Sequence, residues 1–286
     1  MAIDEYQQIT YEVNGPVATI ALNRPERRNG YTVRMADELA DAFPRADADD
    51  DIRVVVFTGH GNDFSVGADL DGETFADRAF AGDAPAEFHE PAGRASLAIF
   101  VMNKPVIAAI RGAAVGAGST IILPADYRLA ANDSRFGYVF TRRGIVPEGA
   151  STWFLPRLVG MGAALDWMIS GRVFDAAEAH ASGLVHRLYA PDDVLPAAYE
   201  LAAELAAKTS PVSVAVTRQL LYRMAALDSP FPVRDLDSQL IAGAAGNADA
   251  IEGIMSFLQR RPPQFPGRVS TDLPDYLPWR KTGETR

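Results

Sequence analysis

Two glycine-rich stretches decide the fold: residues 59–70 are GHGNDFSVGADL and residues 112–118 are GAAVGAG. Each follows an apolar run typical of a buried strand, RVVVFT at 53–58 and PVIAAI at 105–110. Backbone N–H groups freed at two such turns can converge on one oxygen, and the second turn also opens a helix, whose N-terminus favours negative charge. For either turn alone, a tight turn or close packing that needs glycine is the alternative.

The segments around these turns predict an α/β core. ITYEV and VATIAL flank Asn14-Gly15, a strong signal for a β-hairpin. Apolar residues at helical intervals predict helices at 32–46 and 93–102, and DYRLAA at 126–131 predicts a further strand. Because strand, turn and helix repeat in this order, we expect at least partly parallel pairing. Residues 71–92 lack periodicity and are predicted to form a mobile lid.

The composition changes near residue 190. Residues 191–259 are rich in Ala and Leu at helical spacing, with no strand signal. The tail at 260–280 carries enough Pro that we expect it to wrap a surface without forming a helix. We therefore divide the chain into a core at 1–190 and a helical C-terminal region at 191–286.

Overall composition excludes several classes of function. The chain has 286 residues, 48% hydrophobic and 22% charged, with a net charge of −10, which argues against general nucleic-acid binding. It has no cysteine, which excludes a thiolate nucleophile and Cys-ligated metals, and its four histidines lack metal-ligand spacing. No stretch resembles a secretory signal or a membrane span, so we expect a cytoplasmic protein without a membrane partner.

The turns and their flanks together resemble a known family. DFSVGADL at 63–70, LNRPERRN at 22–29 before it and GAAVGAG after it are similar to the crotonase, or enoyl-CoA hydratase/isomerase, superfamily. The likeness runs from about residue 11 to 261 and ends in FLQRRPPQFPGR at 257–268. It implies a spiral of repeated ββα units with a helical C-terminal part for oligomerisation and closure of the site. It also implies a homotrimer or dimer of trimers and an acyl-CoA thioester substrate, with no cofactor beyond the substrate's coenzyme A.

The resemblance also implies the positions of the site residues. The thioester oxygen is expected between the backbone amides of Ala68 and Ala117, an oxyanion hole in which the side chain plays no part. The positions implied for contacts with the acyl-CoA are Arg27, Arg28, Asp69, Leu70, Gly116, Phe140 and Trp153. Asp69 is interpreted as an acceptor that fixes the loop rather than as a base. For each arginine the alternative is a solvated surface position.

The expected reaction depends on which carboxylate is present. Hydratases of the superfamily use two glutamates, and the motifs place Thr120 and Phe140 at those positions, so ordinary hydration is disfavoured. Glu148, in GIVPEGAS at 144–151, resembles the base of Δ3,Δ2-enoyl-CoA isomerases, in which one carboxylate moves a proton from C2 to C4. The alternative is a glutamate in the first turn of a helix. The helix dipole would lower its pKa, whereas burial would raise it.

Other activities remain as alternatives. One is an enoyl-CoA hydratase, and another is a hydrolase or dehalogenase that attacks through the carboxylate at position 148. Ser119 as the nucleophile of a Clp-type peptidase lacks the expected histidine and acid. A subunit that binds acyl-CoA without turnover is the non-enzymatic alternative.

Overall fold

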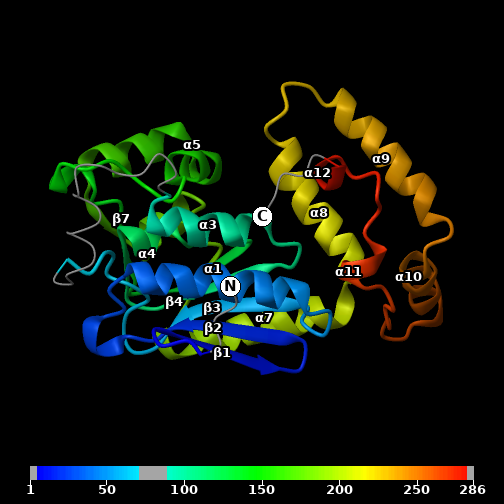
Figure 1. Ribbon diagram of the computed structural model, residues 1–286, viewed down its shortest axis with the longest axis horizontal. Coiled ribbons are helices and arrows are strands. Elements are labelled where there is room, and N and C mark those ends of the chain that lie inside the picture. The colour runs from blue at the N-terminus through cyan, green and yellow to red at the C-terminus, as the bar shows by residue number, and fades with distance from the viewer. Residues whose placement is uncertain (1–4, 71–88, 282–286) are drawn as a thin grey trace.

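A computed structural model describes residues 5–70 and 89–281 (Figure 1). Its large sheet has six strands in the order β1-β2-β3-β4-β6-β9, of which β1 and β2 form an antiparallel hairpin and the other neighbours are parallel. The strands are β1 (Ile9–Asn14), β2 (Val17–Leu22), β3 (Val54–Gly59), β4 (Val106–Ile110), β6 (Tyr127–Ala131) and β9 (Arg187–Tyr189). The predicted hairpin is confirmed. The predicted lid lies outside the described residues except for 89–92.

The two faces of the large sheet are covered by different helices. Along β3, Val55 and Phe57 lie in the main core with residues of α1 (Val33–Ala48) and α3 (Pro91–Val101). Val54 and Val56 alternate with them and pack on the opposite face with residues of α7 (Val194–Lys208). Figure 1 shows α7 on the side of the sheet opposite to α1 and α3. Because both faces are buried here, the central strands β3 and β4 are almost entirely apolar, as the sequence indicated.

A second, smaller sheet includes part of the second glycine-rich turn, and a bridge between Ser65 and Ala114 joins the first turn to it. Its strands are β5 (Ala113–Val115), β7 (Arg135–Gly137) and β8 (Val173–Asp175), in that order. The chain passes from β4 to β5 and α4 (Ala117–Thr120), and then from β6 to β7 and α5 (Ser151–Ser170). These are the expected repeated ββα units. Two corrections follow: the second turn contains strand β5, and the helix expected after it is only the four-residue α4.

Short elements complete the core. They are the 3-10 helices η1 (Pro25–Arg27), η2 (Thr141–Arg143) and η3 (Pro191–Asp193) and the helix α6 (Ala176–Ala181). The helix α5 is interrupted at Gly160, whose φ of 77° is not helical. No described helix, within residues 5–70 and 89–281, has the length and hydropathy needed to cross a bilayer.

The C-terminal helices stand beside the core rather than on it (Figure 1). They are α8 (Pro211–Met224), α9 (Phe231–Ala244), α10 (Ala248–Gln259), α11 (Val269–Asp272) and α12 (Pro278–Lys281). Val212, Leu236 and Leu277 form a small separate core. Residues 191–281 contain no strand, as predicted, although α7 covers the sheet. The expectation of a tail without helices was wrong, because Pro278 occupies the first position of α12, where no amide donor is needed.

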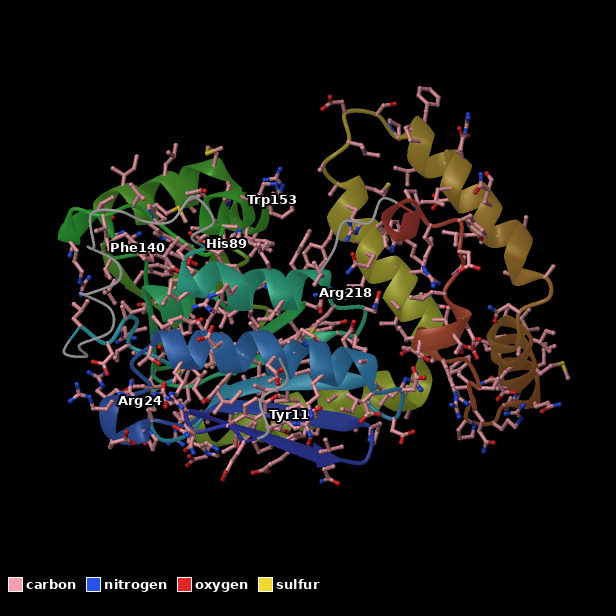
Figure 2. All side chains as sticks on the ribbon, in the orientation of Figure 1. Tyr11, Arg24, His89, Phe140, Trp153 and Arg218 are labelled. Atoms are coloured by element: carbon pink, nitrogen blue, oxygen red, sulfur yellow. The ribbon has the colours of Figure 1, made fainter. Side chains whose placement is uncertain are left out.

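One buried side chain fixes α8 to the core. Arg218 is 5% exposed, and its Nε lies 2.9 Å from both carboxylate oxygens of Asp126. Its Nη2 donates to the carbonyl oxygen of Ile99 at the end of α3, at 2.9 Å. Figure 2 shows Arg218 where α8 meets α3. The helical region is therefore held at its base, while α9 and α10 extend away from the core.

Candidate active site

The first glycine-rich turn offers the backbone N–H of Ala68. Tyr31 N donates to Gly67 O at 2.8 Å and Asp69 N donates to Tyr31 O at 2.9 Å. Because successive amides of an extended segment point in opposite directions, the N–H of Ala68 lies on the other edge. Among the described residues it has no hydrogen-bond acceptor.

The second turn likewise offers a backbone N–H, at the start of the helix α4. Gly116 N donates to Gly137 O at 2.8 Å, whereas Ala117 is the first residue of α4. The first amides of a helix have no carbonyl partner within it. The Ala117 N–H likewise has no acceptor within the part of the chain that the structure describes.

Pairing between the turns brings these two amides together. Ser65 and Ala114 form a parallel bridge, and Ala68 and Ala117 each follow three residues later. The preceding glycines are in contact: a Cβ on Gly116 would lie 3.6 Å from Gly67 Cα. Gly67 has a φ of 90°, and a Cβ there would lie 2.7 Å from a carbonyl oxygen. Glycine is therefore needed both for conformation and for close approach, while the adjoining amides stay free.

Two residues that hold the first turn were missed by the sequence analysis. Asn29 is fully buried, and its Nδ2 donates to His60 O at 2.9 Å and to Asp63 O at 2.8 Å. Ser65 Oγ donates to Asn29 O at 2.7 Å. Asn29 has a φ of 53°, a conformation that asparagine adopts more readily than most residues. The asparagine at the end of LNRPERRN was the available signal.

The arginines of LNRPERRN are paired with acids of the same turn. Arg24 Nη2 lies 2.9 Å and Arg27 Nη2 lies 3.2 Å from the Asp69 carboxylate, which is 8% exposed. Burial alone would raise the pKa of Asp69, but these hydrogen bonds outweigh it and the pKa is lowered. Arg28 Nε lies 2.7 Å from Asp63. Asp69 thus accepts hydrogen bonds from two arginines of the neighbouring loop, in agreement with the loop-fixing role favoured over a base. Contacts of these residues with coenzyme A remain predictions.

Glu148 lies beside the second turn, not in a helix. The helix α5 begins at Ser151, whose N–H donates to Glu148 O at 3.1 Å, so the alternative of a first-turn helix glutamate was wrong. Thr120 Oγ1 lies 2.7 Å from Glu148 Oε1 and 3.1 Å from Ala117 O. In the shorter of these two contacts the Thr120 hydroxyl donates to the Glu148 carboxyl group.

A second carboxylate, Glu90, adjoins Glu148 and was not predicted. Glu90 caps α3, and its Oε2 accepts from Gly93 N at 2.8 Å. Its Oε1 accepts from Gly149 N, also at 2.8 Å. Glu90 also shares a hydrogen bond with the Glu148 side chain. Two carboxyl groups are thus held together at the start of α3 and α5.

Burial raises the pKa of Glu148 to about 8, and the negative charge of Glu90 and their shared hydrogen bond act in the same direction. The hydrogen bond with Thr120 opposes this shift only in part. The sequence left open whether a helix dipole lowers the pKa of Glu148 or burial raises it, and burial dominates. A carboxyl group with such a pKa can both accept and return a proton near neutral pH.

The remaining predicted residues lie in different surroundings. Phe140 is 6% exposed and belongs to the main core. Trp153 packs edge-on against Phe100 and Phe154, with ring centroids 5.7 and 4.9 Å apart, respectively. In Figure 2, Trp153 lies toward the C-terminal helices and Phe140 lies away from them. Leu70 is 58% exposed, at the last described residue before the gap at 71–88.

Ser119 is fully buried, and its Oγ donates to Ala114 O and accepts from Gly137 N at 3.3 Å. The hydroxyl joins β5 to β7. It is therefore a structural link between strands rather than an accessible nucleophile.

Comparison with known proteins identifies the family. The model of the enoyl-CoA hydratase/isomerase family matches residues 12–268, which is most of the chain. The chain belongs to this family. Members of this family act on acyl-CoA thioesters, which is consistent with two free amides beside a carboxyl group.

Individual relatives cover nearly the whole chain. The enoyl-CoA hydratase ACTT3 of Alternaria alternata is 38% identical over 262 residues, covering 88% of this chain and 85% of that relative. The 1,2-epoxyphenylacetyl-CoA isomerase of Escherichia coli K12 is 32% identical over 265 residues, covering 91% and 98%. A crystal structure of a probable enoyl-CoA hydratase/isomerase from Mycobacterium abscessus has a TM-score of 0.83 and 34% identity, covering 91% and 99%. The expected crotonase fold is confirmed.

Proposed function

We propose that this enzyme isomerises 3-enoyl-CoA thioesters to 2-enoyl-CoA thioesters, with Glu148 as the proton carrier. The observation that supports it is the buried carboxyl group of Glu148, which has a raised pKa and lies beside a turn that offers a free backbone amide. The two positions at which hydratases of the superfamily place glutamates hold Thr120 and Phe140 here.

The reaction needs only these groups. Glu148 removes a proton from C2, and the electrons of the C–H bond delocalise over the C3–C4 double bond and the thioester carbonyl. The resulting dienolate oxygen would be stabilised by the N–H groups of Ala68 and Ala117, which form the proposed oxyanion hole. Glu148 then returns the proton to C4, which leaves the double bond between C2 and C3. One carboxyl group serves both transfers.

The pH dependence of isomerisation follows from the raised pKa. Glu148 must be ionised to accept the proton from C2, so kcat/KM should fall as the pH drops below about 8. We expect about a tenfold loss per pH unit on the acidic side, measured with purified enzyme and a 3-enoyl-CoA. A flat profile between pH 5 and 7 would contradict a buried carboxyl base.

Hydration of 2-enoyl-CoA is the second candidate. ACTT3 carries the hydratase name, and Ser96 Oγ is buried with no hydrogen-bond partner among the described residues. A Cβ on Gly149 would lie 3.1 Å from both Ser96 Oγ and Thr120 Oγ1, so two hydroxyls adjoin this turn. Incubation with 2-enoyl-CoA separates the candidates, because a hydratase forms the 3-hydroxy product and an isomerase forms the 3-enoyl product.

The proposal includes a homotrimer or a dimer of trimers. Apolar side chains on α9 and α10 are exposed in the single chain, and large exposed apolar patches mark interfaces. They are Ile241, Ile251, Ile254, Phe257 and Leu258. Light scattering on the purified protein should give the mass of a trimer or hexamer, and a monomeric mass would contradict this assembly.

A further inference from the structure

The second carboxylate at the site has no role in the reaction described above. Glu90 lies at the start of α3, and both of its oxygens accept backbone N–H groups, from Gly93 and Gly149. The second of these bonds joins it to the residue after Glu148. A Cβ on Gly93 would lie 2.2 Å from Glu90 Oε1, so the helix start leaves room for this carboxylate only because residue 93 is glycine.

The negative charge of Glu90 acts on Glu148 without an opposing positive charge among the described residues. Tyr31, which lies within reach of both carboxyl groups, is fully buried and donates its hydroxyl to Pro91 O at 3.3 Å. Arg94, which also acts on Tyr31, is paired with Asp37.

We propose that Glu90 is a positioning residue for Glu148: it fixes the peptide at 148–149 through the Gly149 N–H and makes Glu148 a stronger base. Both oxygens of Glu90 accept backbone N–H groups, whereas the Glu148 side chain accepts none among the described residues, so we assign the proton of the pair to Glu148. Two adjacent carboxyl groups cannot both ionise easily, which leaves one to hold the proton.

This arrangement suits a proton carrier. The proton removed from C2 must stay on Glu148 until it is delivered to C4, and a nearby negative charge retains it there. The inference rests on the proposed role of Glu148, and it assigns the second carboxyl group of the same site. It implies that Glu90 changes the pH range of the enzyme without touching the substrate.

The test compares E90Q and E90D with the wild type. Glutamine at position 90 removes the charge and turns its NH₂ group toward the N–H of either Gly93 or Gly149. Aspartate keeps both the charge and the helix cap. We expect the acidic limb of the kcat/KM profile to move down by about one pH unit or more in E90Q. The plateau should fall by about tenfold, because a weaker base accepts the C2 proton less readily. E90D should keep most of the wild-type limb.

A matched control separates charge from capping. Asp175 caps α6 by accepting from Glu178 N at 2.8 Å and is not among the residues of the proposed site, so D175N makes the same change of acid to amide at a helix start. D175N should leave the pH limb in place. An unmoved limb in E90Q, or an equal shift in E90D, would overturn the positioning role.

A readout without turnover keeps this inference separate from the proposed function. The carboxylic-acid C=O band that is present in the wild type and absent in E148Q reports protonation of Glu148 by infrared spectroscopy. In E90Q this band should disappear at a lower pH. If the wild type isomerises no 3-enoyl-CoA, the proposed function fails while this titration still decides the role of Glu90. An unchanged titration in E90Q, with isomerisation intact, overturns only the role of Glu90.

Discussion

Replacing Glu148 by glutamine is expected to lower kcat for isomerisation by about 100- to 10,000-fold, because the only proposed proton carrier is lost. The fold should persist. Glutamine has nearly the same shape, and its side-chain oxygen can still accept the hydrogen bond from Thr120. Glutamine is neutral, as the Glu148 carboxyl group is below its raised pKa of about 8, so the midpoint of urea unfolding at neutral pH should not decrease. Steady-state assays with a 3-enoyl-CoA measure the loss.

A comparable substitution elsewhere provides the control. Glu178 accepts a hydrogen bond from Trp167 Nε1 at 2.8 Å and lies on α6, so E178Q should keep wild-type turnover. If E148Q isomerises as fast as the wild type, another group moves the proton and the proposed function is wrong.

The second large effect is expected for A117P, which removes the backbone N–H proposed to hold the dienolate oxygen. Loss of one such donor lowers kcat by about 100- to 1,000-fold. Proline is compatible with the first position of a helix, and Ala117 is the first residue of α4. Gly116 before it has a φ of 57° and a ψ of −124°, outside the helical region that a following proline disfavours. The pyrrolidine ring of the proline also occupies the space beside the lost N–H, which should lower kcat further.

The matched control is A176P. Ala176 is the first residue of α6, is fully buried and follows a residue with a ψ of 171°. It places proline at the same helix position outside the two turns. We expect A176P to retain turnover, with circular dichroism confirming that both variants fold. Undiminished isomerisation by A117P would show that the thioester oxygen is not held by this amide.

Much of the fold follows from local signals in the sequence. The hairpin at β1 and β2 is encoded by Asn14-Gly15, and the apolar runs of β3 and β4 encode strands buried on both faces. The tail was mispredicted because proline was treated as excluding helix, whereas Pro278 begins α12, where its missing N–H has no cost. Strands of three residues, such as β8 and β9, are too short to show a period.

The sequence by itself determined the family, the two turns and the identity of the carboxyl group at position 148. The tertiary structure alone decided that the turns pair through Ser65 and Ala114. It also decided that Glu90 accepts a hydrogen bond from Gly149, which is 59 residues later in the sequence and follows Glu148. The physical reason is that turn and strand propensities act between neighbours in sequence. The affinity of a carboxyl group for its proton instead depends on burial and on charges that only folding brings near.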